Sequence, residues 1–179
     1  MKILLLVIVS FFLIIFTVEG MIKTLHPLKY KEYVFKYSTE NKLDPYLVFS
    51  VIKAESSFNP DATSHRNARG LMQITDDTAK WVAQKMGLKD FEVEQLYDPE
   101  INIRMGCWYL NNLRQEFGDN KDLILAAYNG GRGHVNKWLK NKELSSTGES
   151  LDKIPFEETD RYVKKVNNYY IIYKKLYDN

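Results

Sequence analysis

Glu55 is the residue whose position most clearly suggests chemistry. It ends a stretch in which Val48, Val51 and Ile52 form an apolar stripe at helical spacing, so its carboxyl group is expected to point inward. Burial penalises the charged form of a carboxyl group and raises its pKa. A carboxyl that stays protonated near neutral pH can give a proton to a leaving oxygen, which is general-acid catalysis. Periodicity alone also allows an exposed Glu55, because glutamates at helix ends commonly face water.

Other reactive groups are sparse. His26, His65 and His134 have no Cys, Asp or Glu at the spacing of metal ligands, so we predict no metal site and no cofactor. Cys107 is the only cysteine; it lies on an apolar helix face without an evident base, which favours an inert core thiol over a nucleophile. The glycine-rich segment 130–133 lacks the strand and the lysine of a phosphate-binding loop, so we interpret it as a turn that lines a cleft.

Composition limits the class of protein. The chain has 179 residues, of which 45% are hydrophobic and 27% charged, a balance typical of one globular domain with a core. The formal net charge is only +2, with no long run of like charges, which argues against a nucleic-acid partner.

The amino-terminal segment is expected to meet a membrane. Between Ile3 and Val18 only Ser10 and Thr17 are polar, and the residues that follow form a poor cleavage site for a signal peptidase. We therefore divide the chain into a signal anchor or signal peptide over residues 1–22 and a catalytic domain over residues 23–179. The expected location of the domain is the wall side of the cell membrane, or the exterior if the segment is cleaved.

From residue 23 onward the pattern is almost wholly helical, without the sustained alternation that is typical of strands. Asp-Pro pairs at 44–45 and 98–99 combine a capping carboxylate with a proline that tolerates the first helical position, and glycines at 87 and 118 are typical helix stops. The predicted helices run from 45 to about 55, from 75–77 to 87, from 99 to 118, over 121–128, around 135–139, and from about 159 onward.

A polar stretch separates the last two predicted helices. Residues 140–152 include the sequence Ser-Ser-Thr-Gly and are predicted to form a mobile surface loop, which could close one end of a cleft. No internal repeat and no second domain boundary are predicted. The expected fold is a mainly α single domain behind an amino-terminal hydrophobic helix.

Blocks of sequence in a fixed order extend from about Leu43 to Val166. The first block is ESSFNPDATS from Glu55, and the second is ARGLMQI from Ala68. The third has DP at 98–99 and NI at 102–103, followed by G at 106 and YL at 109–110 in a predicted helix. The last two are AAYNGG from Ala126 and ET at 158–159 with YV at 162–163. Together these blocks resemble the signature of peptidoglycan lytic transglycosylases of the soluble (SLT) type, in the goose-lysozyme-like superfamily. The resemblance implies a lysozyme-like helical domain.

Carried over by position, the resemblance implies that Glu55 is the single catalytic acid and base. It also implies a set of substrate-binding or site-ordering residues: Ser64, Gly70, Met72, Gln73, Tyr128, Asn129, Glu158 and Tyr162. Gly130 stands where the family commonly has alanine, a departure that affects the flexibility of a turn more than the chemistry.

The residue types suit these roles but allow plainer ones. The Ser64 hydroxyl can bond an acetamido or hydroxyl group of a sugar, or only stabilise its own turn. Met72 offers adaptable apolar area to a substrate, or belongs to the core. Tyr128 can steady developing charge beside the acid, or be a buried structural tyrosine, and Glu158 and Tyr162 can equally be structural.

The resemblance implies cleavage of the β-1,4 bond between N-acetylmuramic acid and N-acetylglucosamine, with closure of a 1,6-anhydro ring and no use of water. The Glu55 block holds no obvious second carboxylate of the kind that two-carboxylate glycosidases need, and assistance by the substrate's acetamido group would fill that role. The expected partners are peptidoglycan glycan strands and, through the first helix, a membrane.

Two alternatives stay open at this point. One is a hydrolytic muramidase of goose-lysozyme type on the same scaffold, which would admit water and leave a reducing end. The other is a glycan-binding module without catalysis, for which the combination of Glu55, Ser64 and Tyr128 would be unnecessary.

Overall fold

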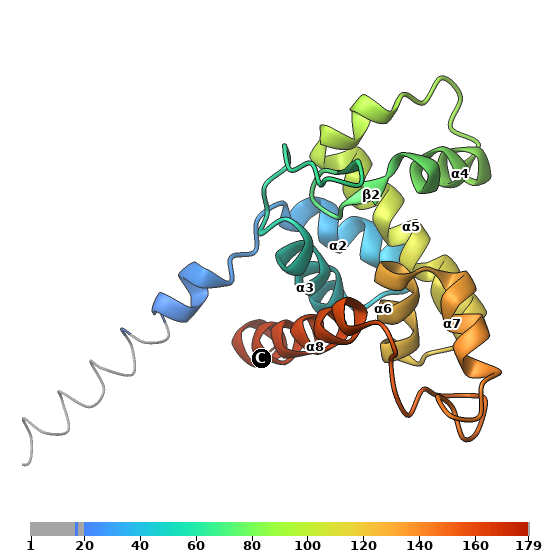
Figure 1. Ribbon diagram of the computed structural model, residues 1–179. Helices are drawn as coiled ribbons and strands as arrows, with labels where there is room; N and C mark the ends of the chain where they lie inside the picture. Colours follow the sequence, from blue (N-terminus) through green and yellow to red (C-terminus); the bar gives the residue numbers. More distant parts are fainter. Residues whose placement is uncertain (1–16, 18–19, 179) are drawn as a thin grey trace, which may run out of the picture.

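The computed structural model describes residues 17 and 20–178, and within them the chain forms a mainly α domain with a small hairpin (Figure 1). This confirms the predicted fold class. The elements in chain order are α2 (Lys31–Glu40), α3 (Pro45–Glu55), β1 (Ala68–Arg69), β2 (Ile74–Thr75), α4 (Asp76–Met86), a 3-10 turn (Val93–Tyr97), α5 (Pro99–Phe117), α6 (Lys121–Gly130), α7 (Arg132–Leu139) and α8 (Glu157–Tyr177).

Helix boundaries follow the local signals in the sequence. The Asp44 carboxylate accepts a hydrogen bond of 2.8 Å from the backbone nitrogen of Tyr46 at the start of α3. Asp98 caps α5 in the same way, through a bond of 2.9 Å from the nitrogen of Ile101. Gly87 ends α4 in a left-handed conformation with φ of 67°, which glycine adopts at little cost. The predicted starts and stops at these positions are confirmed.

Three parts of the prediction need correction. Helix α2 was not anticipated, because it buries only Val34, Tyr37 and Ser38 and has no long apolar stripe. The strands β1 and β2 pair antiparallel, with Ala68 opposite Thr75, but two residues each are too short to give an alternating pattern. The last helix begins at Glu157, about two residues earlier than predicted, with acidic residues in its first turn that suit the helix dipole.

Residues 140–152 form the predicted helix-free loop, but its own polar groups hold it together. The buried Ser145 hydroxyl donates to the backbone oxygen of Ser150 over 2.6 Å and accepts from the nitrogen of Gly148 over 2.9 Å. The Asp152 carboxylate accepts from the nitrogen of Ser146 over 2.7 Å. The loop is therefore cross-linked by hydrogen bonds, which the expectation of a mobile loop did not foresee.

Helix α3 lies at the centre of the domain, packed along α8 and beside α2 (Figure 1). Its residues Val48, Phe49, Val51 and Ile52 are all fully buried. Because α3 is enclosed in this way, the residue at its carboxyl end is held in a fixed place. Cys107 on α5 is also fully buried, and burial raises the pKa of its thiol, as a core thiol requires.

The segment before α2 is attached to α8. The Tyr177 hydroxyl donates a bond of 2.8 Å to the backbone oxygen of His26, and the Tyr173 hydroxyl donates one of 3.2 Å to that of Pro27. The predicted anchor or signal peptide over residues 1–22 falls almost entirely outside the described residues. Among the described residues, no helix has both the length and the apolar character needed to cross a bilayer.

Candidate active site

Glu55 is the last residue of α3, and the chain reverses direction directly after it. Ser57 and Phe58 both lie in the left-handed region, with φ of 51° and 66°, a conformation that is costly for residues other than glycine. The Ser56 hydroxyl donates a bond of 2.8 Å to the backbone oxygen of Leu71, between the two hairpin strands. The reversal therefore brings the hairpin against the end of α3.

The Glu55 carboxyl group has a strongly raised pKa, about 7 instead of 4.5. Burial is the main cause, and the negative charge of Glu158 adds to it. The Tyr162 hydroxyl and the positive charge of Lys165 act in the opposite direction, but they do not offset the burial. Near neutral pH a large fraction of Glu55 therefore carries a proton that it can donate.

Two tyrosines flank this carboxyl group, Tyr128 partly buried and Tyr162 buried. Tyr128 on α6 donates a hydrogen bond of 2.7 Å to the backbone oxygen of Met72, which fixes its ring beside the hairpin turn. Tyr162 on α8 places its hydroxyl against Glu55, but that oxygen has no partner of good hydrogen-bond geometry among the described residues. Burial and the neighbouring Glu55 raise the pKa of both phenols, so both stay neutral.

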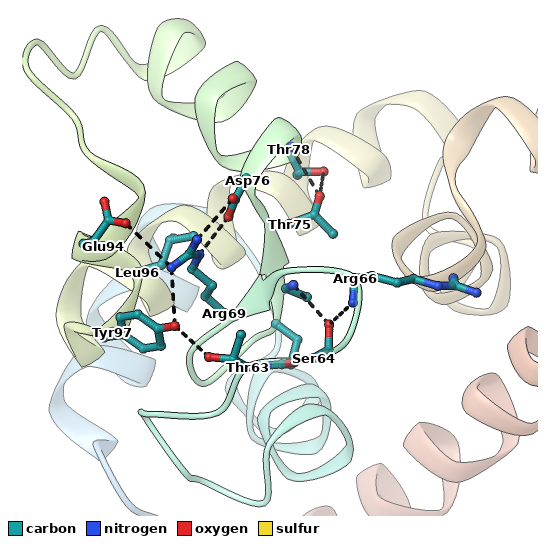
Figure 2. Close-up of polar contacts among 12 residues, drawn as sticks. Thr63, Ser64, Arg66, Arg69, Thr75, Asp76, Thr78, Glu94, Leu96 and Tyr97 are labelled. Atoms are coloured by element: carbon teal, nitrogen blue, oxygen red, sulfur yellow. Dashed lines mark hydrogen bonds and ion pairs between the residues drawn. The ribbon is translucent and has the colours of Figure 1, made fainter.

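Ser64 stabilises its own turn and keeps a proton available. Its hydroxyl oxygen accepts bonds from the backbone nitrogens of Arg66, at 3.2 Å, and Ala68, at 3.1 Å (Figure 2). Within the described part of the chain, the Ser64 hydroxyl donates to no acceptor. The turn role and the sugar-binding role are thus compatible, because accepting two bonds leaves the O–H group free for a ligand.

Gly70 and Gln73 stabilise the conformation of the hairpin, Gly70 by allowing close packing and Gln73 by hydrogen bonds to the backbone. Gly70 has φ of 73°, and a side chain there would collide with the backbone oxygen of Leu96 and the amide of Asn102. The Gln73 amide donates to the backbone oxygens of Ala62, at 3.0 Å, and of Gly70, at 2.9 Å. Close approach of backbone to backbone, rather than approach to a ligand, is what requires glycine at position 70.

A charged clamp holds the hairpin against the start of α4 (Figure 2). The Arg69 guanidinium donates to both carboxylate oxygens of Asp76, at 2.8 and 3.2 Å, and keeps the pKa of that carboxyl below its usual range. It also donates to the Tyr97 hydroxyl at 3.4 Å, and this hydroxyl bonds the Thr63 hydroxyl at 2.6 Å. The clamp therefore fixes the residue directly before Ser64.

Met72 does not offer its side chain to a substrate, so that expectation is corrected. The side chain is fully buried, and its sulfur lies where a side chain on Gly106 would otherwise be. The Met72 nitrogen donates to the buried Asn102 side chain at 2.8 Å. What Met72 presents toward the site is its backbone oxygen, which receives the Tyr128 hydroxyl.

A hydrogen bond joins the end of α6 to the start of α8. The Thr159 hydroxyl donates a bond of 2.8 Å to the side-chain oxygen of Asn129, which leaves the Asn129 amide nitrogen uncommitted among the described residues. Glu158 is about two thirds exposed and lies 3.8 Å from the Arg66 guanidinium, so it joins α8 loosely to the Ser64 turn.

These elements enclose a cavity of about 180 Å³. It brings together six of the nine predicted site residues, while Gly70, Met72 and Tyr162 do not line it. The lining residues are Glu55, Ser64, His65, Arg66, Ala68, Gln73, Thr75, Tyr128, Asn129 and Glu158.

Sequence reasoning missed four lining residues, which are His65, Arg66, Ala68 and Thr75. His65 and Arg66 directly follow Ser64 in the same tight turn, a proximity that could have indicated them. Thr75 gave a helix-start signal, and its hydroxyl does accept from the nitrogen of Thr78 at 3.4 Å. Nothing local in the sequence shows that the same residue borders the cavity.

The arrangement suits proton transfer to and from a bound molecule. A carboxyl with a pKa of about 7 can act first as an acid and then, once ionised, as a base. Among the described residues, no group of three or more His, Cys, Asp or Glu side chains is placed to hold a metal ion.

Comparisons with known proteins agree with the geometry. Residues 32–150 match the family described as the transglycosylase SLT domain. The soluble lytic murein transglycosylase of Escherichia coli is 35% identical over 150 residues, which cover 83% of this chain and 23% of that protein. The chain thus spans about a quarter of the length of such relatives.

Solved structures show the same fold. The crystal structure of the 70 kDa soluble lytic transglycosylase of E. coli superposes with a TM-score of 0.77 at 34% identity, over 86% of this chain and 25% of that one. The structure of an inactive mutant of a lytic transglycosylase from Pseudomonas aeruginosa gives a TM-score of 0.73 at 32% identity, over 84% and 24%.

Proposed function

The chain belongs to the transglycosylase SLT domain family, and from this premise we propose that it cleaves peptidoglycan without water. The bond cleaved is the β-1,4 bond between N-acetylmuramic acid and N-acetylglucosamine, and the product is a 1,6-anhydromuramic end. The observation that carries the proposal is the Glu55 carboxyl group at the end of α3, with a pKa of about 7, in a cavity shared with Ser64, Tyr128 and Asn129.

In the first step, protonated Glu55 gives its proton to the oxygen that bridges the two sugars. The bond between that oxygen and the anomeric carbon of the muramic sugar breaks, and its electron pair leaves with the oxygen. Positive charge develops at the anomeric carbon. The acetamido group of the same sugar can share that charge, since the Glu55 block supplies no second carboxylate for it.

In the second step, ionised Glu55 takes the proton of the 6-hydroxyl of the muramic sugar. The oxygen released in this way attacks the anomeric carbon and closes the 1,6-anhydro ring. Glu55 ends protonated, as it began, so a single residue serves as acid and base. A pKa near the working pH is what both half-reactions require.

The neighbouring side chains position the sugar. The free O–H of Ser64 is suited to donate to the acetamido oxygen, and the free amide N–H groups of Asn129 to donate to glycan oxygens. Gln73, held by two backbone bonds, keeps the wall of the cavity rigid. Tyr128 and Tyr162 flank the acid; the Tyr162 hydroxyl lowers the pKa of Glu55, and the charge of Glu158 raises it.

Glu158 also favours a second candidate function. It is an exposed carboxylate that lines the same cavity as Glu55, and it could direct a water molecule to the anomeric carbon. The protein would then be a hydrolytic muramidase of goose-lysozyme type. We rank it second, because Glu158 is about two thirds exposed and lies 3.8 Å from the Arg66 guanidinium, which competes for its carboxylate.

The proposed substrate lies outside the cell membrane, so the domain is proposed to act on the wall side. Residues 1–22 would then hold it at the membrane, or direct its secretion if they are cleaved. This proposal rests on the apolar character of residues 3–18 in the sequence.

The test is mass spectrometry of the soluble fragments that the full 179-residue chain releases from purified peptidoglycan. Anhydromuramic products, one water lighter than hydrolytic ones, are expected, and Glu55→Gln should release none. Reducing ends would support the muramidase instead. Absence of any product from the folded wild-type chain would leave a glycan-binding module.

A further inference from the structure

A hollow of about 490 Å³ lies between α6, α8 and the loop before α8, and it has no part in the proposed chemistry (Figure 1). Its walls come from the start of α6, from loop residues 150–154 and from positions 160, 163, 164 and 167 of α8, which share one face of that helix. None of the residues that line it also lines the Glu55 cavity. The hollow is therefore a separate candidate site.

Backbone and side-chain hydrogen bonds fix the walls of this hollow. In the loop, the backbone nitrogens of Asp152 and Lys153 donate to the backbone oxygen of Leu144, at 2.8 and 3.3 Å. On the helical side, the Asn167 amide donates a bond of 2.8 Å to the Asp122 carboxylate and so joins α8 to α6. Because the walls are already held in place, a ligand would not have to order them.

Three carboxylates from three separate elements line the hollow: Asp122 on α6, Asp152 in the loop and Asp160 on α8. Each has one oxygen engaged, Asp122 with the Asn167 amide, Asp152 with the nitrogen of Ser146 at 2.7 Å, and Asp160 with the ammonium group of its neighbour on α8 at 2.7 Å. The second oxygen of each carboxylate makes no hydrogen bond or ion pair within the described residues. Three acceptors thus remain available to a ligand.

A fourth acceptor in the hollow lacks a donor. The side-chain oxygen of Asn167 is buried, and it has no hydrogen-bond partner in the part of the chain that the structure describes. Leaving a buried acceptor unpaired is costly, so each such atom calls for an explanation. Since Asn167 lines the hollow, its unpaired oxygen indicates a ligand that brings N–H or O–H donors.

The floor of the hollow is aliphatic. Leu123 and Val163 are buried there, and Leu151 and Ile154 are half-buried. The lining residues include no aromatic ring, so the hollow has no flat surface on which a ring of the ligand could stack. An aliphatic floor is suited to methylene groups.

The charge of the hollow favours a cation. Two ammonium groups line it together with the three carboxylates, which gives a net charge of −1. Lys164 is already paired with Asp160, and Lys153 is exposed at the rim. Asp160 and Asn167 are seven residues apart on α8, so these two acceptor residues are about 10 Å apart along the helix. A ligand that reaches both has to be elongated.

We propose that this hollow binds a linear aliphatic polyamine of about the length of spermidine. Its ammonium groups donate to the free oxygens of Asp122, Asp152 and Asp160, and its methylene groups lie on the aliphatic floor. The inference does not depend on the proposed function. A bound polyamine would join α6, α8 and the loop, and it would thereby stabilise the two helices that carry Asn129 and Glu158 to the Glu55 cavity.

The test is calorimetry with the full chain at about 0.15 M salt, where exposed charges more than about 8 Å apart are largely screened. The probes are spermidine and butylamine, which has a single ammonium group on an aliphatic chain. We expect spermidine to bind at least about tenfold more tightly than butylamine, the scale of one charge-assisted contact. Asp122→Asn and Asp152→Asn should each weaken spermidine binding by about fivefold to tenfold.

Both substitutions keep the fold within reach of the test. An asparagine oxygen can still accept from the Asn167 amide at position 122, and from the nitrogen of Ser146 at position 152. Glu149→Gln is the matched control, because Glu149 is exposed beside the loop residues of the hollow but does not line it. This variant should bind spermidine as the wild type does.

The possible results separate a built site from diffuse charge. Equal affinities for spermidine and butylamine overturn the proposal, and so do equal losses in Asp122→Asn and Glu149→Gln. Displacement of spermidine by an equal concentration of magnesium chloride also overturns it, since a polyamine site has to recognise more than positive charge. Cleavage of peptidoglycan is measured separately: a chain that cleaves but does not bind spermidine retains the proposed function, and a chain that binds but does not cleave retains only the polyamine site.

Discussion

The Tyr128 hydroxyl donates a hydrogen bond of 2.7 Å to the backbone oxygen of Met72. This contact joins α6 to the turn between β1 and β2, two segments that are more than fifty residues apart in the chain. It also commits the phenol proton to a backbone acceptor, so Tyr128 cannot serve as the acid. Glu55, which lines the same cavity and has a pKa of about 7, can give up a proton near neutral pH.

Glu55→Gln should preserve the fold and abolish most turnover. The amide has nearly the shape of the carboxyl group but cannot donate or accept a proton in the reaction. General acid catalysis typically contributes about 10²–10⁴ in rate, so kcat for release of soluble muropeptides should fall by about that factor. Circular dichroism would verify the fold. A folded variant with more than about a tenth of wild-type activity would refute the role given to Glu55.

The same substitution should change how stability depends on pH. The Glu55 pKa is about 7 in the folded protein against an ordinary value of 4.5. Between these values the unfolded chain has lost the proton and the folded chain still holds it. The stabilising contribution is thus complete below about 4.5 and disappears as the pH rises through about 7.

Each pKa unit corresponds to about 1.4 kcal/mol, so wild type should lose about 3 kcal/mol relative to Glu55→Gln between pH 4 and pH 8. Urea unfolding of both proteins at both pH values measures how much more unfolding free energy the wild type loses than Glu55→Gln does. An unchanged difference would mean that the Glu55 carboxyl group is not buried in the folded protein.

Two neighbouring charges should move the pH profile in opposite directions. Activity should fall above about pH 7, because Glu55 must start protonated. The charge of Lys165 lowers the pKa of Glu55 and that of Glu158 raises it. Lys165→Gln should therefore shift the alkaline midpoint of kcat upward, and Glu158→Gln should shift it downward. Lys175→Gln, at an exposed position farther along α8, is the control. Shifts of the same sign in both test variants would contradict the electrostatic account.

The sequence predicted what local chemistry determines. The capping carboxylates of Asp44 and Asp98 act on backbone nitrogens within three residues, so their effect is readable without the fold. The apolar stripe before Glu55 indicated an inward position, but periodicity alone also allowed an exposed carboxyl group, and the family blocks decided between the two. The family blocks added Ser64, Tyr128 and Asn129, and these do line the cavity.

What the sequence could not predict depends on distant partners. Met72 is core and not cavity wall because Gly106, more than thirty residues away, leaves room for its sulfur. Helix α2 has a weak apolar face and is held by packing against α3 and α5. The Arg132 guanidinium at the start of α7 lies 5.1 Å from the centre of the Trp81 ring on α4, and no spacing rule connects these two positions.

Gly70→Ala should be strongly destabilising. The added methyl group would meet the backbone oxygen of Leu96 and the Asn102 amide, and φ of 73° is unfavourable for alanine. Overpacking and left-handed strain together should cost about 2–4 kcal/mol of unfolding free energy. Gly133→Ala is the control, because a side chain at that helical position meets no atom within 4 Å and alanine favours helix. Equal stability of the two variants would show that the hairpin can shift to accommodate the added methyl group.

Tyr97→Phe tests whether the clamp beside Ser64 matters for activity. The Tyr97 hydroxyl is bonded to Thr63 at 2.6 Å and to the Arg69 guanidinium at 3.4 Å, while its ring packs near that guanidinium at 5.7 Å. Phenylalanine keeps the ring and removes only the hydroxyl. The residue before Ser64 then loses its side-chain bond, and the hydroxyl that is to hold the sugar is less well placed.

We expect kcat/KM to fall by about threefold to tenfold, the range that corresponds to loss of one positioning hydrogen bond. The alkaline midpoint of the pH profile should not move, because Tyr97 does not contribute to the pKa of Glu55. Tyr33→Phe is the matched control, since the Tyr33 hydroxyl has no hydrogen bond among the described residues. If Tyr97→Phe retains full activity while its melting temperature drops, the clamp stabilises the hairpin without positioning Ser64.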